Sequence, residues 1–161
     1  MDKIKPTKYY STKQENSIAD YLGWSVVAAS GARPFHPGDI RSDDFLGECK
    51  THTSKQSDIV IYKDVWRKIT SEATSVMKRP VLFVDNGTQK IKNTWCVLPE
   101  RFLSDKNIIQ CDIIMTESKN KLLFSHEVWD AILEINKCAT FKIYDESLLL
   151  MKLNTFKILF C

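Results

Sequence analysis

The feature that most constrains this chain is a short apolar segment, Phe45 to Thr51, that carries two charged residues at alternate positions. It reads Phe-Leu-Gly-Glu-Cys-Lys-Thr and has the length and composition of a β-strand. Side chains two residues apart in a strand point to the same face, so Glu48 and Lys50 share one side while Cys49 points toward the core. Burying such charges is costly unless a partner compensates them. The preceding strand opens with Asp39, and a cation bound by Asp39 and Glu48 would provide that compensation.

The elements before this segment follow from capping and turn signals. Residues 11–15, Ser-Thr-Lys-Gln-Glu, have the spacing of a capping box, which predicts a helix over residues 12–22 that ends at Gly23. A β-prone run then occupies residues 24–29, and a loop rich in turn formers occupies residues 30–38. We expect two strands next, at 39–41 and 45–51, joined by a turn at 42–44.

The second half of the chain continues the alternation of helix and strand. Apolar residues recur at helical spacing from Asp64 to Lys78, which predicts a second helix. A strand at 80–85, a hairpin turn at Asn86–Gly87 and a partner strand at 92–98 are expected to follow. This order predicts an α/β protein with a central mixed β-sheet flanked by helices. Beyond Pro99 the patterns predict a helix at 127–136 and strands at 141–144 and 148–153.

Length and composition set wider limits. A chain of 161 residues fits a single domain spanning 1–161 with a sizeable core. The net charge of +3 permits nucleic-acid binding without requiring it. The five cysteines are scattered without zinc-ligand spacing, and Cys49 and Cys96 lie in apolar stretches typical of core residues. No signal-peptide pattern or membrane-length apolar run occurs, so we expect a cytoplasmic protein.

The residue types in the Asp39–Lys50 segment suit phosphodiester hydrolysis. That reaction needs a water made nucleophilic near neutral pH and a cation that offsets the charge developing on the phosphate. Mg²⁺ takes oxygen ligands, including one or two carboxylates. Asp39, Glu48 and the backbone carbonyl of Cys49 could supply such ligands, while Lys50 could orient the water or hold the phosphate.

The same residues resemble the pattern of the PD-(D/E)XK nuclease superfamily, an acidic residue opening one strand and Glu-X-Lys on the next. Here the pattern reads Pro37-Gly38-Asp39 and Glu48-Cys49-Lys50, with Gly38 separating the usual Pro-Asp pair. Residues 11–85 also follow the order of the superfamily's common core. The Ser-Gly-Ala loop, the Gly-Asp-Ile strand start and Glu-Cys-Lys-Thr are most similar to archaeal-type Holliday junction resolvases and their phage-borne relatives.

This resemblance implies a restriction-endonuclease-like core at residues 11–98, with residues 99–161 as a C-terminal elaboration. It implies a Mg²⁺ cofactor, for which Mn²⁺ can substitute. In such resolvases a glutamate on the first helix joins the metal site and a loop serine is also needed, positions that Glu15 and Ser30 match here. Each has a plainer explanation: Glu15 could be a capping-box carboxylate, and Ser30 could have no role beyond beginning a turn.

Other polar residues near the motif are alternatives or accessories. Asp43 or Asp44 could replace Asp39 as the acid, although their place in a turn favours a solvated role. His36 could act as a general acid, or it could simply be exposed in its loop. Basic residues that flank the motif and could contact DNA phosphates are Arg33, Arg41 and Lys55.

The leading functional hypothesis from the sequence is a Mg²⁺-dependent DNA endonuclease that resolves Holliday junctions during DNA recombination. The alternatives are a restriction- or repair-type nuclease of the same superfamily, or a catalytically silent nucleic-acid-binding module. A four-way DNA junction has two-fold symmetry and needs two opposing cuts, so a resolvase is expected to be a homodimer. Apolar residues near the end of the chain could form the dimer interface or could cover the sheet: Phe156, Ile158, Leu159 and Phe160.

Overall fold

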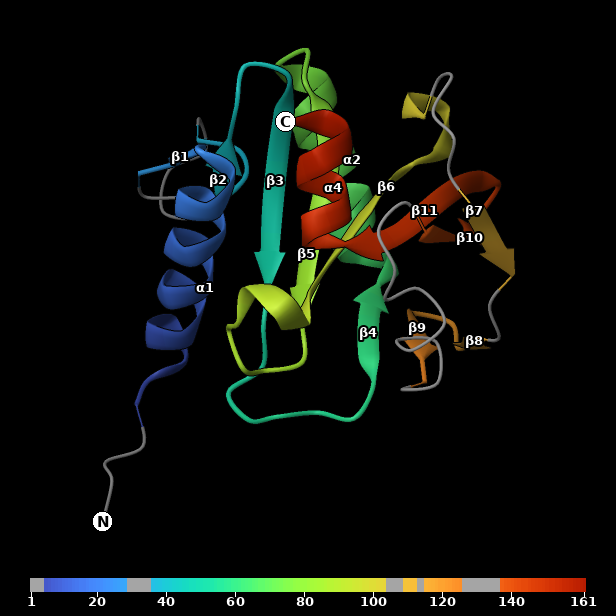
Figure 1. Ribbon diagram of the computed structural model, residues 1–161, viewed down its shortest axis with the longest axis horizontal. Coiled ribbons are helices and arrows are strands. Elements are labelled where there is room, and N and C mark those ends of the chain that lie inside the picture. Colours follow the sequence, from blue (N-terminus) through green and yellow to red (C-terminus); the bar gives the residue numbers. More distant parts are fainter. Residues whose placement is uncertain (1–4, 29–35, 104–108, 113–114, 126–136) are drawn as a thin grey trace.

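A mixed sheet of eight strands forms the centre of the computed structural model, which describes residues 5–28, 36–103, 109–112, 115–125 and 137–161 (Figure 1). Its strands pair antiparallel except β3 with β5 and β10 with β7, which are parallel. A smaller sheet of three strands lies beside it. In spatial order the large sheet contains β1 (Ser25–Val26), β2 (Ile40–Arg41), β3 (Phe45–Lys50), β5 (Arg79–Asp85), β6 (Thr94–Pro99), β11 (Glu146–Lys152), β10 (Lys137–Ile143) and β7 (Ile109–Asp112), and the small sheet contains β4 (Ile59–Tyr62), β9 (Lys121–Phe124) and β8 (Met115–Glu117).

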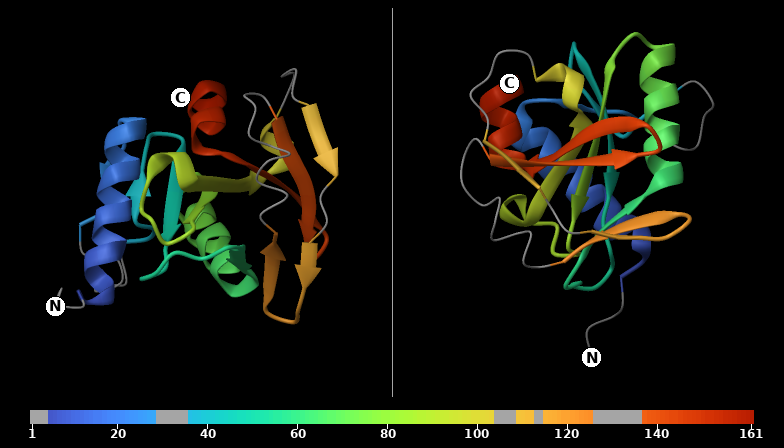
Figure 2. Two further views of the ribbon diagram at one scale, coloured as in Figure 1. Left: turned by 60° about the horizontal axis from the view of Figure 1, so that its bottom comes forward. Right: turned by 90° about the vertical axis from the view of Figure 1, so that its right-hand side faces the viewer.

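Helices cover both faces of the large sheet. The helix α2 (Lys63–Ser75) lies on one face, and the short C-terminal helix α4 (Leu153–Phe160) lies on the other (Figure 2). Buried residues of α1 (Thr7–Leu22) belong to the same core cluster as those of α4. The predicted α/β class, with a central mixed sheet flanked by helices, is therefore confirmed.

The alternation of side chains along β3 divides its residues between the two core clusters. Leu46 packs in the cluster that contains the α2 residues, whereas Phe45 and Cys49 pack in the cluster that contains α1 and α4. Glu48 and Lys50 follow Leu46 by two and four residues, so their side chains project on the same side of the sheet as Leu46, the α2 side. This places the predicted acid and lysine on one face, as the sequence indicated.

Several predicted elements of the first half agree with the structure, and two differ. The strands at 39–41, 45–51 and 80–85 correspond to β2, β3 and β5, and Gly23 ends α1 in the left-handed conformation with φ of 73°. The capping box was wrong, because α1 begins at Thr7 after Pro6 and residues 11–15 lie inside the helix. Proline fixes φ near the helical value and suits a helix start. Of the run at 24–29, described as far as residue 28, Ser25–Val26 pair in the sheet, since the partner strand β2 has two residues.

The regions around α2 and β6 also depart from the prediction. The strand β4 was missed, and α2 ends at Ser75 rather than Lys78. The two-residue hairpin at Asn86–Gly87 is wrong, because residues 86–93 form a longer connection that ends in a 3₁₀ turn, η1 (Ile91–Asn93). The strands β5 and β6 that flank this connection do pair antiparallel, as expected.

The C-terminal region contains more strand than the sequence indicated. The predicted strand at 141–144 falls largely within β10, and the one at 148–153 within β11 apart from Leu153, which begins α4. The strands β7, β8 and β9 and the helix α4 were missed, as was the 3₁₀ turn η2 (Glu100–Phe102). The predicted helix at 127–136 lies outside the described residues.

The helix α4 covers the sheet with Phe156 as its largest buried side chain, while Leu159 and Phe160 pack partly buried against the same core. Phe156 is fully buried and its ring contacts those of Trp24, Phe45, Phe83 and Phe160 at centroid distances of 5.2–5.9 Å. Phe45 is the first residue of β3, so this aromatic cluster fixes the strand that carries Glu48 and Lys50. Phe156 therefore serves to cover the sheet, as one of the two predicted roles had it. Ile158 on the same helix does not, because it is 59% exposed.

Replacing Phe156 with alanine should destabilise the fold by about 3–5 kcal/mol, because it removes a large buried ring and leaves a cavity. The matched control on the same helix is Ile158→Ala, expected to change the free energy of unfolding by no more than about 0.5 kcal/mol. Urea unfolding of both variants measures these effects. Similar losses for the two variants would show that α4 does not cover the sheet as described.

Candidate metal centre

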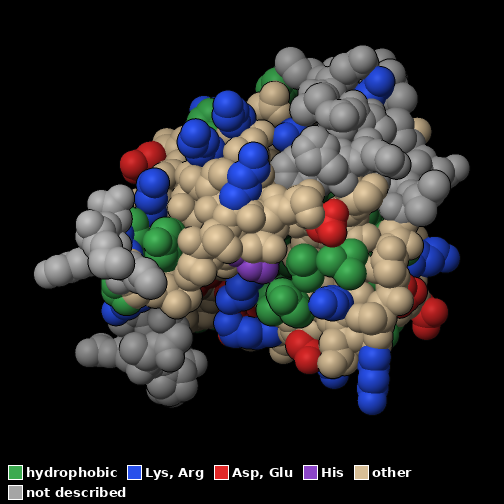
Figure 3. All heavy atoms as spheres, turned by 90° about the horizontal axis from the view of Figure 1, so that it is seen from below, with side chains coloured by type: hydrophobic (Ala, Val, Ile, Leu, Met, Phe, Trp, Pro, Cys, Tyr) green, Lys and Arg blue, Asp and Glu red, His purple; other side chains and the backbone are tan. Residues whose placement is uncertain are grey.

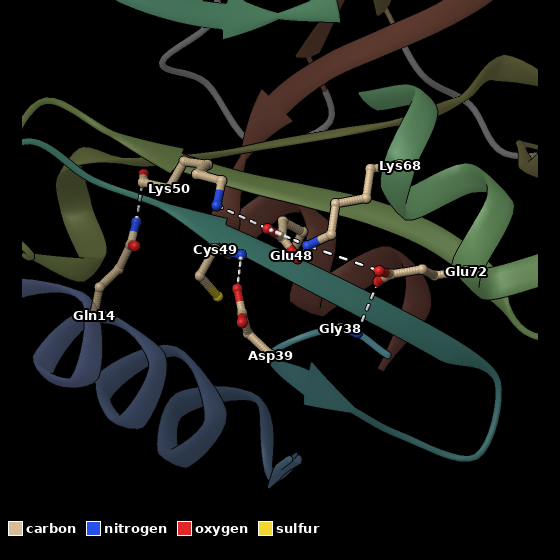
Figure 4. A network of polar contacts seen from close by, with 8 residues as sticks. All are labelled: Gln14, Gly38, Asp39, Glu48, Cys49, Lys50, Lys68 and Glu72. Atoms are coloured by element: carbon tan, nitrogen blue, oxygen red, sulfur yellow. Dashed lines mark hydrogen bonds and ion pairs between the residues drawn. The ribbon is translucent and has the colours of Figure 1, made fainter. Parts of the chain in front are cut away.

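The outer edge of β3 is only partly covered by its neighbouring strand. The two residues of β2 pair with Leu46 and Gly47, so within the described part of the chain no strand lies beside the last residues of β3 on that edge. Side chains take over there: Asp39 Oδ2 accepts the backbone N–H of Cys49 at 2.8 Å, and the amide of Gln14 donates to the carbonyl of Lys50 at 2.8 Å (Figure 4). The need to satisfy backbone groups thus places Asp39 directly beside Glu48 and Lys50.

Glu48 is a buried carboxylate held by two lysines. Its side chain is only 2% exposed. Lys50 Nζ lies 2.7 Å from Oε1, and Lys68 Nζ lies 3.2 Å from Oε1 and 3.3 Å from Oε2 (Figure 4). An unpaired carboxylate at this depth would be strongly destabilising, so both ammonium groups stabilise the folded chain.

A second carboxylate, Glu72, connects α2 to the segment before Asp39. Glu72 lies one turn after Lys68, with 3.7 Å between its Oε1 and Lys68 Nζ. Its other oxygen, Oε2, accepts the backbone N–H of Gly38 at 2.9 Å. Gly38 has φ of +70°, and an added Cβ would lie 2.7 Å from the Leu46 side chain, so glycine is needed here. The chain is therefore fixed immediately before Asp39.

Glu15 on α1 lies close enough to Asp39, Glu48 and Lys50 to interact with their charges. Burial first, and then the charges of Asp39 and Glu48, raise the pKa of Glu15 above its usual value. Burial likewise raises the pKa of the Cys49 thiol well above its usual range, with Asp39, Glu15 and Glu48 adding to the effect. Cys49 is consequently a neutral core thiol, as the sequence suggested.

The end of β3 is tied to the loop after β5 by a second polar network. Asp85 is 3% exposed and its Oδ1 accepts from the Thr51 hydroxyl at 2.5 Å and from the N–H of Gly87 at 2.8 Å. Gln89 donates to the Thr51 hydroxyl at 2.9 Å and to the carbonyl of His52 at 3.1 Å. This network holds the chain as it leaves Lys50.

The structure brings together the three residues of the predicted motif. Asp39, Glu48 and Lys50 meet at one edge of the sheet, and Glu15 is close enough to interact with the two acids. Asp43 and Asp44 are exposed in the turn before β3, as expected of solvated residues, and His36 is also exposed. Ser30 and Arg33 lie outside the described residues.

The two remaining predicted DNA contacts lie at opposite ends of β3. Arg41 is exposed and pairs with Leu46 near the start of the strand, whereas Lys55 is exposed in the connection that follows its end. They cannot contact one phosphate together from these positions.

Sequence reasoning missed Lys68, Glu72 and Gln14. The four-residue spacing of Lys68 and Glu72 on the polar face of α2 was visible, but such pairs are common on exposed helices. Gln14 was noticed only as a capping residue, yet it is 1% exposed, and its Oε1 is buried without a hydrogen-bond partner.

The oxygen donors present suit a hard divalent cation. Asp39, Glu48 and Glu15 supply carboxylates, which Mg²⁺ prefers. Among the described residues, however, no three His, Cys, Asp or Glu side chains already form a metal-binding cluster. Glu48 contacts two lysines, and one oxygen of Asp39 accepts from the backbone. The chemistry of the donor set fits Mg²⁺, and metal binding would require these contacts to rearrange.

Comparison of the chain with models of known protein families, with curated proteins and with solved structures found no match. Within the described part of the chain, no helix has the length and apolar character needed to cross a membrane.

The raised pKa of Glu15 makes stability depend on pH in a defined direction. A carboxyl whose pKa is higher in the folded chain favours folding below its unfolded pKa, about 4.3, and that contribution is lost as pH rises through the folded pKa. In EDTA, Glu15→Gln should therefore be more stable than the wild type at pH 8, and the difference should shrink toward pH 4.

Urea midpoints measured from pH 4 to pH 8 test this expectation. Asp20→Asn, which alters an exposed carboxylate on the same helix, is the control. If the two variants show the same pH profile, Glu15 does not share a field with Asp39 and Glu48.

Proposed function

We propose that this chain is a Mg²⁺-dependent nuclease that hydrolyses DNA phosphodiester bonds, with Asp39, Glu48 and Lys50 at its centre. The observation that carries the proposal is the buried Glu48 carboxylate, which lies beside Asp39 and is contacted by Lys50 at an incompletely covered strand edge. A structural strand has no need for this combination of charges. The resemblance of the motif to PD-(D/E)XK nucleases, with their restriction-endonuclease-like core, supports the same conclusion.

Asp39, Glu48, the backbone carbonyl of Cys49 and Glu15 are the groups that would hold the metal. When bound, Mg²⁺ would lower the pKa of a coordinated water and offset charge on the phosphate. The Lys50 side chain is 46% exposed, so its ammonium group can reach a phosphate oxygen or the attacking water while its stem stays on the strand. Asp39, held by the N–H of Cys49, would keep its other oxygen in a fixed direction.

A cleavage panel tests the proposal most directly. Four-way junction, flap, linear duplex and single-stranded DNA are each incubated with Mg²⁺, Mn²⁺ or EDTA. Cleavage of at least one substrate with either metal, and of none in EDTA, is expected. Metal binding without cleavage of any of these DNAs would favour a catalytically silent nucleic-acid-binding module, in which the lysine contacts of Glu48 serve stability alone.

Loss of the Asp39 or Glu48 carboxylate, or of the Lys50 ammonium group, should abolish cleavage. Asp39→Asn, Glu48→Gln and Lys50→Ala are each expected to lower the cleavage rate at least about a hundredfold, because each removes a group worth several kcal/mol in the transition state. Circular dichroism and DNA binding should change much less. Asp43→Asn, an exposed carboxylate in the turn before β3, is the matched control and should cleave normally.

A wild-type rate for Asp39→Asn, or inactivity of Asp43→Asn, would show that the acidic residue has been assigned wrongly.

Within this class we propose a Holliday junction resolvase that acts as a homodimer on branched DNA. Resolving a junction requires cuts on two opposing strands, and one chain carries one proposed site. Lys and Arg side chains (blue) are spread over the face toward which β3 points, where DNA arms could lie (Figure 3). Exposed candidates for phosphate contact are Lys5, Lys8 and Lys55, whereas the predicted contact Arg41 lies at the opposite end of β3.

Light scattering at micromolar concentration should show a dimer, and a four-way junction should compete better than a linear duplex of equal length. Raising salt should weaken binding steeply, because phosphate contacts release counter-ions. A monomer without junction preference would rule out the resolvase assignment and leave the nuclease assignment unaffected, with a restriction- or repair-type enzyme as the alternative.

A further inference from the structure

Lys68 occupies a position between two carboxylates at the candidate metal centre. Its ammonium nitrogen lies 3.2 and 3.3 Å from the two oxygens of Glu48 and 3.7 Å from an oxygen of Glu72 (Figure 4). Its side chain is 53% exposed, whereas Glu48 is almost completely buried. Lys68 therefore lies on the solvent side of Glu48, from which a dissolved cation would approach.

The contacts of Lys68 conflict with metal coordination by Glu48. A carboxylate binds a metal through the same oxygen lone pairs that accept hydrogen bonds. Lys68 contacts both Glu48 oxygens, and Lys50 contacts one of them. A divalent cation that binds Glu48 must therefore compete with an ammonium group already in contact with it.

Glu72 provides a second partner for the displaced ammonium group. It follows Lys68 by one helical turn, a spacing at which a lysine and a glutamate can pair. Its position is fixed because its other oxygen accepts the N–H of Gly38. Lys68 extends from the helix surface and is half exposed, so a change of rotamer can move its head group from Glu48 to Glu72 without moving α2.

We propose that Lys68 is a displaceable counter-ion, which neutralises Glu48 until a divalent cation binds there and is then retained by Glu72. This inference rests on the proposed metal-dependent function. Burial by itself would lower the pKa of Lys68, but Glu48 and Glu72 raise it above its usual value, so the group remains a cation throughout the neutral range.

Two opposite effects of removing Lys68 distinguish this role from simple stabilisation. Without Lys68, the buried Glu48 carboxylate loses a partner, so Lys68→Met should lower the urea midpoint in EDTA. The same change removes the competitor, so the variant should bind Mn²⁺ more tightly than the wild type. A residue that only stabilised the fold would not tighten metal binding when removed.

The experiment is a titration of the full chain with Mn²⁺ in the absence of DNA, followed by the electron paramagnetic resonance of the free ion. Lys68→Met is expected to bind Mn²⁺ at least about fivefold more tightly, since apparent affinity falls with the fraction of sites in the blocked arrangement. Arg67→Met is the matched control: it removes a positive charge from the same helix, but Arg67 is 66% exposed and pairs with Asp64. It should change the affinity less than about twofold.

Two further variants keep the test decisive if Lys68→Met folds poorly. Lys68→Arg retains the charge and can grip a carboxylate with two parallel hydrogen bonds, so Mn²⁺ should bind less tightly than to the wild type. Glu72→Gln removes the alternative partner and should also weaken binding, but only while Lys68 is present. A double-mutant cycle of Lys68→Met and Glu72→Gln should therefore show coupling between the two positions.

The outcomes separate this inference from the proposed function. If the wild type does not bind Mn²⁺, both fail. If the wild type binds Mn²⁺ but Lys68→Met and Arg67→Met bind it equally, or Lys68→Arg binds it more tightly, the displaceable role of Lys68 is overturned and the metal centre stands.

Discussion

The burial of the Glu48 carboxylate is the constraint on which the rest of the site depends. A charge that is 2% exposed can be tolerated only if nearby groups compensate it, and here Lys50 and Lys68 do so from two different elements. Lys68 reaches Glu48 only because α2 packs against this face of the sheet through Trp66 and Ile69, both buried in the core. The packing of α2 on the sheet therefore both buries its apolar side chains and brings Lys68 to Glu48.

The shortness of β2 has a comparable effect on the other side of β3. A longer strand would satisfy the remaining backbone groups of β3 and leave no place for side chains at its edge. Because β2 begins only at Ile40, opposite Gly47, the Asp39 carboxylate accepts the N–H of Cys49 and the Gln14 amide donates to the carbonyl of Lys50. Backbone hydrogen bonding thus determines where the acid lies, before any ligand is considered.

Sequence reasoning succeeded where a short-range rule decides the structure. The two-residue period of a strand placed Glu48 and Lys50 on one face, and the preference of Gly23 for a left-handed backbone ended α1. It failed where packing between distant segments decides. Nothing local shows that Lys68 contacts Glu48, twenty residues away, or that β4 pairs with β9, more than fifty residues later. The capping box failed for a different, local reason, because the helix already begins at Thr7 after Pro6 and residues 11–15 lie inside it.

The charges around Glu48 do not cancel, and this has a consequence for the order of binding. Four carboxylates, those of Glu15, Asp39, Glu48 and Glu72, are grouped with the ammonium groups of Lys50 and Lys68, and Lys8 also acts on Glu15. Burial first, and then the negative charges of Asp39 and Glu48, raise the pKa of Glu15. An acidic site repels a DNA phosphate, so on the proposed function a divalent cation has to bind before the scissile phosphate can approach. Release of Lys68 from Glu48 by that cation would leave its ammonium group beside Glu72, where it no longer competes for Glu48.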